Sequence, residues 1–384
     1  MKMKKTLITF VSIFVSAAIV SSSPAALAEE DSMQLSCPSA VLMDSSTGTV
    51  LYEKDSHSKR PLASVTKIMT MLLAMEAIDS GKLGYDDMIT GSAYAKSMGG
   101  STIFLDEGEQ LSARDILKGI AVSSGNDAAV AMAEHLGGSC ENFVSMMNER
   151  AAQLGMADTH FVNCNGLPAE GHYSTAYDIA LMSRELMRHE GIFDFTTIWM
   201  DSLRGGAFTL SNTNKLIRFY DGATGLKTGS TDEAKFCISA TAKRGNMHLI
   251  AVIMAAPTSK QRSADASKLL NYGFANYSVI PLAAKGEEAA RLHIEKGADG
   301  ETPLVCADDL GYLCQKGEEP QLERTPIFEE NLCAPCAKGD RAGELVITSG
   351  GRELGRCDLI FAENVPRMTY GGVFSSMISK WVRM

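Results

Sequence analysis

The chain has 384 residues, of which 45% are hydrophobic and 21% charged, and its formal net charge is −10. This composition excludes a wholly disordered protein and is sufficient for two folded domains. An acidic chain without a long run of lysine and arginine is a poor match to nucleic-acid binding, because phosphate contacts need clustered cations. We therefore expect no nucleic-acid partner.

The first 28 residues have the pattern of a secretory signal peptide. Three lysines within the first five residues precede an uncharged run from Leu7 to Val20, and Ala26-Leu27-Ala28 forms an A-x-A cleavage site. The uncharged run is short for a membrane-spanning helix. An uncleaved N-terminal anchor is the alternative, but the flanking residues favour export.

The next predicted elements are a β-hairpin and a buried helix. Residues 40–52 hold two short apolar runs around the turn cluster Ser45-Ser46-Thr47-Gly48, which predicts the hairpin. The segment from Ser64 to about Ile78 is compatible with a helix and is apolar on nearly every side, so we expect it to be buried. Helical periodicity continues in three further segments: 113–135, 141–154 and 175–189.

A second hairpin and a closing helix follow. The apolar runs 236–242 and 248–255 flank the turn Arg244-Gly245-Asn246, and residues 264–272 have the pattern of a helix. Strands therefore stand at both ends of this region and helices lie between them. This order predicts an α+β fold in which the terminal strands share one sheet.

The sequence changes character after about residue 278. Short apolar runs alternate with Gly-rich turns as far as residue 367, which predicts a small β-rich domain. Residues 373–384 would place apolar side chains on one half of a helix and serines, Lys380 and Arg383 on the other. Such a cationic amphipathic helix is typical of a membrane interface, and docking of the tail on its own domain is the alternative.

Nine cysteines leave the redox state open. An odd count leaves at least one thiol unpaired or intermolecular, although export permits disulfides. Cys237 lies in an apolar run and is interpreted as a small buried hydrophobic residue. Cys306, Cys314, Cys333 and Cys336 could together bind zinc. Their spacing is not a standard zinc pattern, so a disulfide or free thiols are the simpler interpretations.

The chemistry rests on three short motifs, of which the first is Ser64-Val65-Thr66-Lys67. On a helix, residues i and i+3 share one face, so Lys67 would lie one turn from the Ser64 hydroxyl. A serine is a weak nucleophile until a base removes its proton. A lysine can be that base if burial and a cationic neighbour keep it neutral. Ser56-His57-Ser58-Lys59 has the same pattern, but no apolar helix follows it, and we treat it as a chance match.

The other two motifs are Ser124-Gly125-Asn126 and Lys227-Thr228-Gly229. The hydroxyl of Ser124 could move a proton, and the amide of Asn126 could hold a peptide group. Lys227 and Thr228 offer hydrogen-bond donors to an anion, and Gly229 would let a substrate backbone approach closely. Each motif alone is a common tripeptide, and the signal is specific only when all three occur in this order.

Together, S-x-x-K, S-x-N and K-T-G form the signature of penicillin-binding proteins and serine β-lactamases. The chain resembles the low-molecular-weight penicillin-binding proteins that are D-alanyl-D-alanine carboxypeptidases, from about Cys37 to the C-terminus. The stretch 306–336 that carries four of the cysteines is not part of the resemblance. The layout that the resemblance implies has four parts: a signal peptide (1–28), a catalytic domain with an antiparallel sheet and helices (29–278), a small β-rich domain (279–367) and an amphipathic membrane-anchor helix (368–384).

The resemblance also implies a mechanism. Ser64 would attack the carbonyl between the two terminal D-alanines of a peptidoglycan stem peptide. Lys67 would be the general base, and Ser124 would relay a proton to the leaving amine. Water would then hydrolyse the acyl-enzyme.

Further residues would bind the substrate. Asn126 would position the substrate amide, and the backbone N–H groups of Ser64 and Ser230 would form the oxyanion hole. Lys227 and Thr228 would bind the terminal carboxylate. Arg262 would be a second anchor for that carboxylate, with a solvated surface arginine as the alternative.

No metal or cofactor is implied, and β-lactams are expected as acylating inhibitors. The sequence lacks the E-x-x-L-N loop of class A β-lactamases, so recovery from penicillin should be slow. It also lacks the H-E-x-x-H spacing of zinc peptidases and a G-x-S-x-G elbow. The expected location is the outer face of a bacterial cytoplasmic membrane, reached through 373–384, or the cell wall. The alternatives are a D,D-endopeptidase or transpeptidase, an inactive peptidoglycan-binding relative, and a structural surface protein.

Overall fold

The structure is a computed structural model that describes residues 33–297, 301–318 and 320–369. The proposed signal peptide (1–28) and the proposed amphipathic helix (373–384) lie outside the described residues. Among the helices that are described, none combines the length and apolar character needed to cross a membrane.

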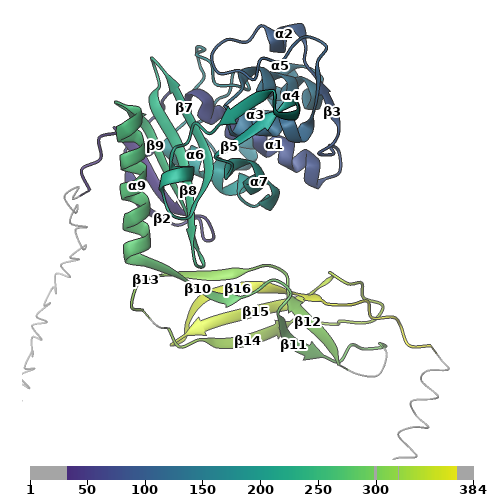
Figure 1. The fold of residues 1–384 in the computed structure, drawn as a ribbon. Coiled ribbons are helices and arrows are strands. Elements are labelled where there is room, and N and C mark those ends of the chain that lie inside the picture. Colours follow the sequence, from purple (N-terminus) through teal and green to yellow (C-terminus); the bar gives the residue numbers. More distant parts are fainter. Residues whose placement is uncertain (1–32, 298–300, 319, 370–384) are drawn as a thin grey trace, which may run out of the picture. The chain divides into compact units, whose positions relative to one another are not determined.

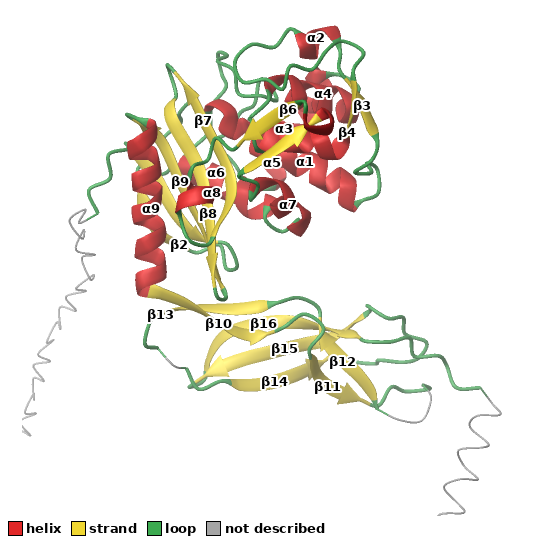
Figure 2. Cartoon of the chain, in the orientation of Figure 1, coloured by secondary structure: helices red, strands yellow, loops and turns green. Residues whose placement is uncertain are grey.

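A five-stranded antiparallel sheet organises the first part of the chain (Figures 1 and 2). Its strands, in spatial order, are β2 (Val50–Lys54), β1 (Ser39–Asp44), β9 (Met247–Ala256), β8 (Lys235–Arg244) and β7 (Ala223–Thr231). The first strand therefore pairs with the last, with Ser39 opposite Met254. This confirms the predicted α+β fold with its terminal strands in one sheet.

Helices and two small hairpins complete this region. The helices are α1 (Lys67–Asp79), α2 (Ala93–Lys96), α3 (Ala113–Ala121), α4 (Asn126–Gly137), α5 (Cys140–Gln153), α6 (Ala176–Leu186), α7 (Phe193–Thr196), α8 (Leu216–Phe219) and α9 (Ser259–Asn276), with 3₁₀ turns at Ala63–Thr66, Glu190–Ile192 and Arg204–Gly206. The hairpins are β3 (Met88–Thr90) with β4 (Gln110–Ser112), and β5 (Met200–Leu203) with β6 (Phe208–Ser211). Strands this short show too little alternation to be predicted.

Both faces of the central sheet are covered. Val41 and Val252 belong to the large core shared with the helices between β2 and β7. Leu42 of β1 and Leu249 of β9 meet Gly273 of α9, which runs along the other face of the sheet (Figure 1). Burial on both faces explains why β1 and β9 have continuous apolar runs instead of alternation.

Two helices differ from their predicted extents in ways that matter for the site. The segment predicted as one helix from Ser64 begins as the 3₁₀ turn Ala63–Thr66 and becomes α1 only at Lys67. The periodic segment 113–135 is two helices, α3 and α4, separated at residues 122–125. Ser124 in this break has φ +62°, a left-handed conformation that a helix interior does not accommodate.

The second part of the chain is β-rich, as predicted. Its larger antiparallel sheet contains β11 (Glu288–Leu292), β12 (Thr302–Cys306), β16 (Arg352–Phe361), β15 (Arg341–Ser349) and β14 (Glu323–Phe328), and a separate pair contains β10 (Tyr277–Ala283) and β13 (Leu310–Gln315). Leu304, Leu345, Leu359 and Phe361 contribute to a core of its own.

All nine cysteines are free thiols in this structure. Cys306 interacts with Cys357, whereas Cys314 forms its hydrogen bonds with Ser278. The sulfur of Cys336 donates to the backbone carbonyl of Cys333. Of the four cysteines considered as zinc ligands, Cys333 and Cys336 contact each other, whereas Cys306 and Cys314 have other partners. The four do not form a metal-binding group among the described residues.

Candidate active site

The first of two lysine–serine pairs is formed where the 3₁₀ turn meets α1. Residues i and i+3 eclipse in a 3₁₀ helix, which places Lys67 over Ser64. The Nζ atom of Lys67 lies 2.9 Å from Ser64 Oγ, and it also donates to Asn126 Oδ1 and to the carbonyl of Asn165, both at 2.6 Å. Lys67 is fully buried, and this burial lowers the pKa of its amine to about 7. Near neutral pH a large share of this amine is therefore unprotonated and able to accept a proton.

A second lysine–serine pair lies opposite. Lys227, on β7, donates from Nζ to Ser124 Oγ at 2.8 Å and to the carbonyl of Thr228 at 3.0 Å. Burial lowers the pKa of Lys227 well below its ordinary value, and the charges of Lys67 and Arg262 lower it further. The structure thus brings all three motifs together, with one serine hydroxyl hydrogen-bonded to each lysine.

The Asn126 amide is held by the protein at both ends. Its Oδ1 accepts from Lys67, and its Nδ2 donates to the carbonyl of Gly99 at 2.7 Å. The neighbouring carboxylate of Asp127 accepts from the backbone N–H groups of Ile103 and Leu105 at 2.9 to 3.0 Å, which fastens the 101–105 loop to the start of α4. Asp127 is a supporting residue for which the sequence gives no signal beyond its place after the second motif.

A polar cavity of about 280 Å³ opens between these elements. Of the residues predicted for the site, those lining it are Ser64, Ser124, Thr228, Gly229, Ser230 and Arg262. Residues not anticipated from the sequence also line it: Ser101, Thr213, Phe236 and Ser259. Lys67, Asn126 and Lys227 do not line the cavity, so they reach it through the hydroxyls and amides that they contact.

Arg262 is a buried cation at one wall of the cavity. Its side chain is on α9, the residue is 5% exposed, and Nη2 donates to Ser259 Oγ at 3.2 Å. Burial lowers the pKa of its guanidinium to about 10, and its Nε has no hydrogen-bond partner among the described residues. The alternative of a solvated surface arginine is therefore wrong, because a buried cation lines the cavity.

Gly229 brings β7 against the turn that carries the nucleophile. A Cβ at this position would lie 2.8 Å from the carbonyl oxygen of Leu62 and 2.9 Å from the backbone nitrogen of Ser64. No other residue fits without moving the strand or the turn. The glycine of the third motif therefore allows β7 to pass close to the backbone nitrogen of Ser64.

A buried histidine supports the same turn. Nδ1 of His172 accepts from the N–H of Val162 at 2.9 Å, which assigns the proton to Nε2, 2.8 Å from Thr66 Oγ1. The Thr66 hydroxyl in turn donates to the carbonyl of Ala63 at 2.8 Å. Burial lowers the pKa of His172 to about 4, so the ring is neutral at ordinary pH. The sequence gives no signal that His172 meets the first motif.

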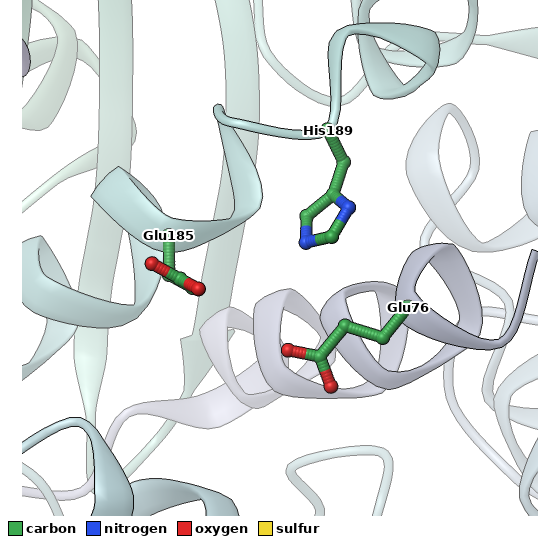
Figure 3. Close-up of side chains that lie close together, drawn as sticks. All are labelled: Glu76, Glu185 and His189. Carbon is green, nitrogen blue, oxygen red and sulfur yellow. The ribbon is translucent and has the colours of Figure 1, made fainter. Parts of the chain in front are cut away.

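Glu76, Glu185 and His189 are the group of potential metal ligands that the described residues contain (Figure 3). Arg150 already pairs with both carboxylates, through Nε to Glu76 and Nη2 to Glu185, each at 2.7 Å. Arg188 also lies 3.5 Å from Glu185, so two guanidinium groups face the two carboxylates and leave little charge for a cation. This group is a structural ion-pair network that joins α1, α5 and α6.

A larger cavity of about 580 Å³ lies between α2, α4 and α5. Its lining includes Tyr94, Glu134 and Cys140, and it contains none of the residues of the three motifs. Volume alone therefore does not identify the reactive site, which is recognised by its two lysine–serine pairs and its buried cation.

Comparison with known proteins gives a consistent result. The family model described as D-alanyl-D-alanine carboxypeptidase matches residues 25–258, and the model described as penicillin-binding protein 5, C-terminal domain, matches 277–367. The second match includes the four-cysteine stretch, which the resemblance noted from the sequence left out.

Individual relatives agree with these matches. The D-alanyl-D-alanine carboxypeptidase DacF of Bacillus subtilis is 42% identical, over 94% of this chain and 95% of its own. Penicillin-binding protein 5 of Haemophilus influenzae has a similar structure, with a TM-score of 0.69 and 30% identity over 87% of this chain and 98% of that one. A DD-transpeptidase of Streptomyces K15 covers 63% of this chain and 98% of its own, with a TM-score of 0.59 and 30% identity.

Proposed function

The chain belongs to the D-alanyl-D-alanine carboxypeptidase family and is a serine carboxypeptidase, and from this premise we propose how its residues divide the reaction. Ser64 is the nucleophile, and its Oγ attacks the carbonyl carbon between the two terminal D-alanines of a peptidoglycan stem peptide. Lys67 accepts the hydroxyl proton, since its buried amine is 2.9 Å away. An acyl-enzyme forms on Ser64, and D-alanine leaves.

We propose that Ser124 and Lys227 protonate the departing amine. The Ser124 hydroxyl lines the cavity and contacts Lys227, so it can pass a proton to the leaving nitrogen and be reprotonated from the lysine. We propose that Asn126 acts chiefly by holding the Lys67 amine in place, because both ends of its amide already have protein partners. Before deacylation, Lys67 releases to solvent the proton that it took from Ser64, and Lys227 regains a proton from solvent. Water then hydrolyses the acyl-enzyme: Lys67 accepts the water proton and returns it to Ser64 Oγ as the ester bond breaks.

The cavity walls bind the charged parts of the substrate. The backbone N–H groups of Ser64 and Ser230 form the oxyanion hole, which the close packing at Gly229 makes possible. Arg262 and Thr228, which both line the cavity, bind the terminal carboxylate, the first through its guanidinium group. Lys227 does not line the cavity, and it adds positive potential through its contact with the Ser124 hydroxyl.

The observation that carries this proposal is the buried Lys67 amine in contact with Ser64 Oγ. The test is D-alanine release from diacetyl-L-Lys-D-Ala-D-Ala by the wild-type protein and by Ser64→Ala. We expect release that is abolished in the variant. Release that persists in Ser64→Ala would contradict the assignment of the nucleophile. Absence of release together with labelling of Ser64 by penicillin would instead favour a transpeptidase.

We also propose that β-lactams acylate Ser64, as members of this family bind both these drugs and stem peptides ending in D-Ala-D-Ala. Cell-wall action by the homologues supports a site of action outside the cytoplasm, with residues 1–28 as the export signal. Residues 373–384 are proposed to bind the outer face of the membrane. Removal of 373–384 should then release the protein from membranes, and continued sedimentation with them would contradict the anchor.

The C-terminal β-rich domain is proposed to be dispensable for the chemistry. The Streptomyces K15 DD-transpeptidase, of which 98% is covered, corresponds to only 63% of this chain, which supports a catalytic unit that folds alone. A chain ending at residue 278 should retain hydrolysis of a soluble peptide, and loss of hydrolysis in a folded shortened chain would contradict this proposal.

A further inference from the structure

A second cavity adjoins the catalytic one at its carboxylate-binding end. It has a volume of about 490 Å³ and lies between α8 and the first turn of α9. Its lining residues are Lys215, Leu216, Phe219, Ser259, Lys260 and Ser263. Ser259 lines both cavities, and its hydroxyl accepts from Arg262. We call this space the side cavity.

The side cavity combines a cationic rim with an apolar floor. Lys215 and Lys260 are exposed, and neither has an ion-pair partner among the described residues. Leu216 is buried, whereas Phe219 is 73% exposed although it is a large aromatic side chain. An exposed aromatic side chain beside a cavity offers apolar surface that a bound ligand would bury.

The surrounding sequence is positive, in contrast to the acidic chain as a whole. No acidic residue occurs from Leu203 to Tyr220 or from Ala256 to Ala264, while the whole chain carries a net charge of −10. Ser259 and Lys260 also begin the 18-residue helix α9, where the first N–H groups have no acceptor inside the helix. The side cavity is therefore complementary to a negative group carried on an aliphatic chain.

We propose that the side cavity is a subsite for the side chain of the leaving D-residue, with preference for an aliphatic side chain that ends in a carboxylate. The inference rests on the proposed function, in which Arg262 and Thr228 hold the α-carboxylate of that residue. Its side chain then lies next to Ser259, at the opening into the side cavity. The reaction is unchanged: the bond from the D-alanine carbonyl carbon to the leaving nitrogen breaks, and Ser124 supplies the proton to that nitrogen.

This subsite would let the enzyme release a D-residue larger than alanine. A leaving residue whose side chain carries a second acidic group, as at a junction between two acidic peptides, would gain contacts that D-alanine lacks. The methylenes would pack on Leu216 and Phe219, and the carboxylate would reach Lys215 and Lys260. Exposed ion pairs are individually weak, so the preference should be moderate and sensitive to salt.

The test compares four substrates of the form diacetyl-L-Lys-D-Ala-D-Xaa. Xaa is D-alanine, D-norleucine, D-2-aminoadipate or D-lysine, which vary the length and charge of the leaving side chain. For the wild-type protein at low salt, we expect kcat/KM for aminoadipate to exceed that for norleucine about three-fold and that for lysine about ten-fold. Release of D-alanine from the first substrate tests the proposed function separately.

Variants assign any preference to the side cavity. Lys215→Glu and Lys260→Glu should each lower the aminoadipate-to-norleucine ratio about five-fold, and Phe219→Ser should lower kcat/KM for both long substrates relative to D-alanine. Lys82→Glu, which makes the same charge change at an exposed lysine lining neither cavity, is the control. Equal kcat/KM values for the four leaving groups, or an equal effect of Lys82→Glu, would overturn the proposal while leaving carboxypeptidase activity intact.

Discussion

The active site and the C-terminal region differ in whether their cations have carboxylate partners. In the catalytic region Lys67, Lys227 and Arg262 are 0%, 1% and 5% exposed, and none has a carboxylate partner within salt-bridge distance among the described residues. In the C-terminal region Arg341 pairs with Glu329, Glu344 and Asp358 on the surface of its sheet, where its side chain is 43% exposed. The contrast is between cations kept unpaired by the fold and cations paired in solvent.

Burial of a charged side chain without a counterion costs free energy. A cluster of such side chains therefore indicates a functional site. The cost appears in the lowered pKa values of Lys67 and Arg262, for which burial is the largest cause. The surface pairs of the C-terminal region shift pKa values without burying the groups. Substitutions of the buried site residues should therefore have large effects on chemistry, and substitutions of the exposed pairs in the C-terminal region should have small ones.

The largest effect is expected for Lys67→Met. Methionine has a similar length but cannot accept the Ser64 proton, so acylation by fluorescent penicillin should slow by about 10²- to 10⁴-fold. Lys82→Met at an exposed site is the matched control and should acylate normally. An acylation rate within ten-fold of wild type would remove Lys67 from the role of base.

The pH dependence of acylation should follow the same amine. Burial lowers the pKa of Lys67 to about 7, so the amine is protonated and inactive as a base below that pH. The second-order acylation rate should rise about ten-fold per pH unit from pH 5 to 6.5 and level off above about 7.5. A rate independent of pH between 5 and 7 would show that Lys67 does not titrate there.

Gly229→Ala tests the packing of β7 against the nucleophile turn. Its new methyl group would be 2.9 Å from the Ser64 nitrogen, so acylation should fall by about 10- to 100-fold through displacement of the oxyanion hole. Gly355→Ala is the control, because it adds the same methyl group to a strand of the C-terminal region, where a Cβ would meet only the side chain of Leu310. Equal rates for the two variants would mean that the close approach is unimportant.

Thr66→Val should have a smaller effect. It removes the hydroxyl that joins His172 to the Ala63 carbonyl and nearly preserves shape. We expect acylation to slow about ten-fold at saturating penicillin, with little change in the concentration for half-maximal rate, and Thr66→Ser to restore it. A loss that Thr66→Ser does not restore would point to packing rather than to the hydrogen bond.

The smallest effect is expected for Arg341→Ala. Its three ion pairs are exposed to solvent and contribute little to stability, so the midpoint of urea unfolding should shift only slightly. Acylation should equal that of wild type. A measurable loss of acylation would show that the second region influences the chemistry, and the contrast drawn above would not hold.

The sequence predicted those features of the fold that depend on residues close together in the chain. The apolar surroundings of Lys67 indicated a buried helix. The order of elements, with strands at both ends of the region and helices between them, indicated one sheet shared by the terminal strands. The convergence of Ser64, Ser124 and Lys227 follows from a resemblance and not from spacing, because no local rule brings segments so distant in the chain together. Arg262 likewise had a role only by that resemblance.

What the sequence left hidden depends on tertiary contact. Helical periodicity continued through 122–125 because those residues are small and do not interrupt the pattern, so the left-handed turn at Ser124 was not predicted. His172 was passed over because its contact with Thr66 is made across the fold, and a lone histidine carries no such information. The need for glycine at position 229 comes from the close approach of Leu62 and Ser64, which the sequence alone does not reveal.

The pairing of β1 with β9 has a consequence for how the chain reaches this structure. In this pairing Ser39 lies opposite Met254, and these residues are near opposite ends of the catalytic region in the sequence. Such non-local pairing gives a high contact order and slow folding, since a long loop must close before the strands gain from meeting. The motif-bearing turn and strand β7 therefore remain unassembled until nearly the whole region is available. A nascent chain that ends before β9 has no site, which would keep the nucleophile inactive until synthesis has passed that strand.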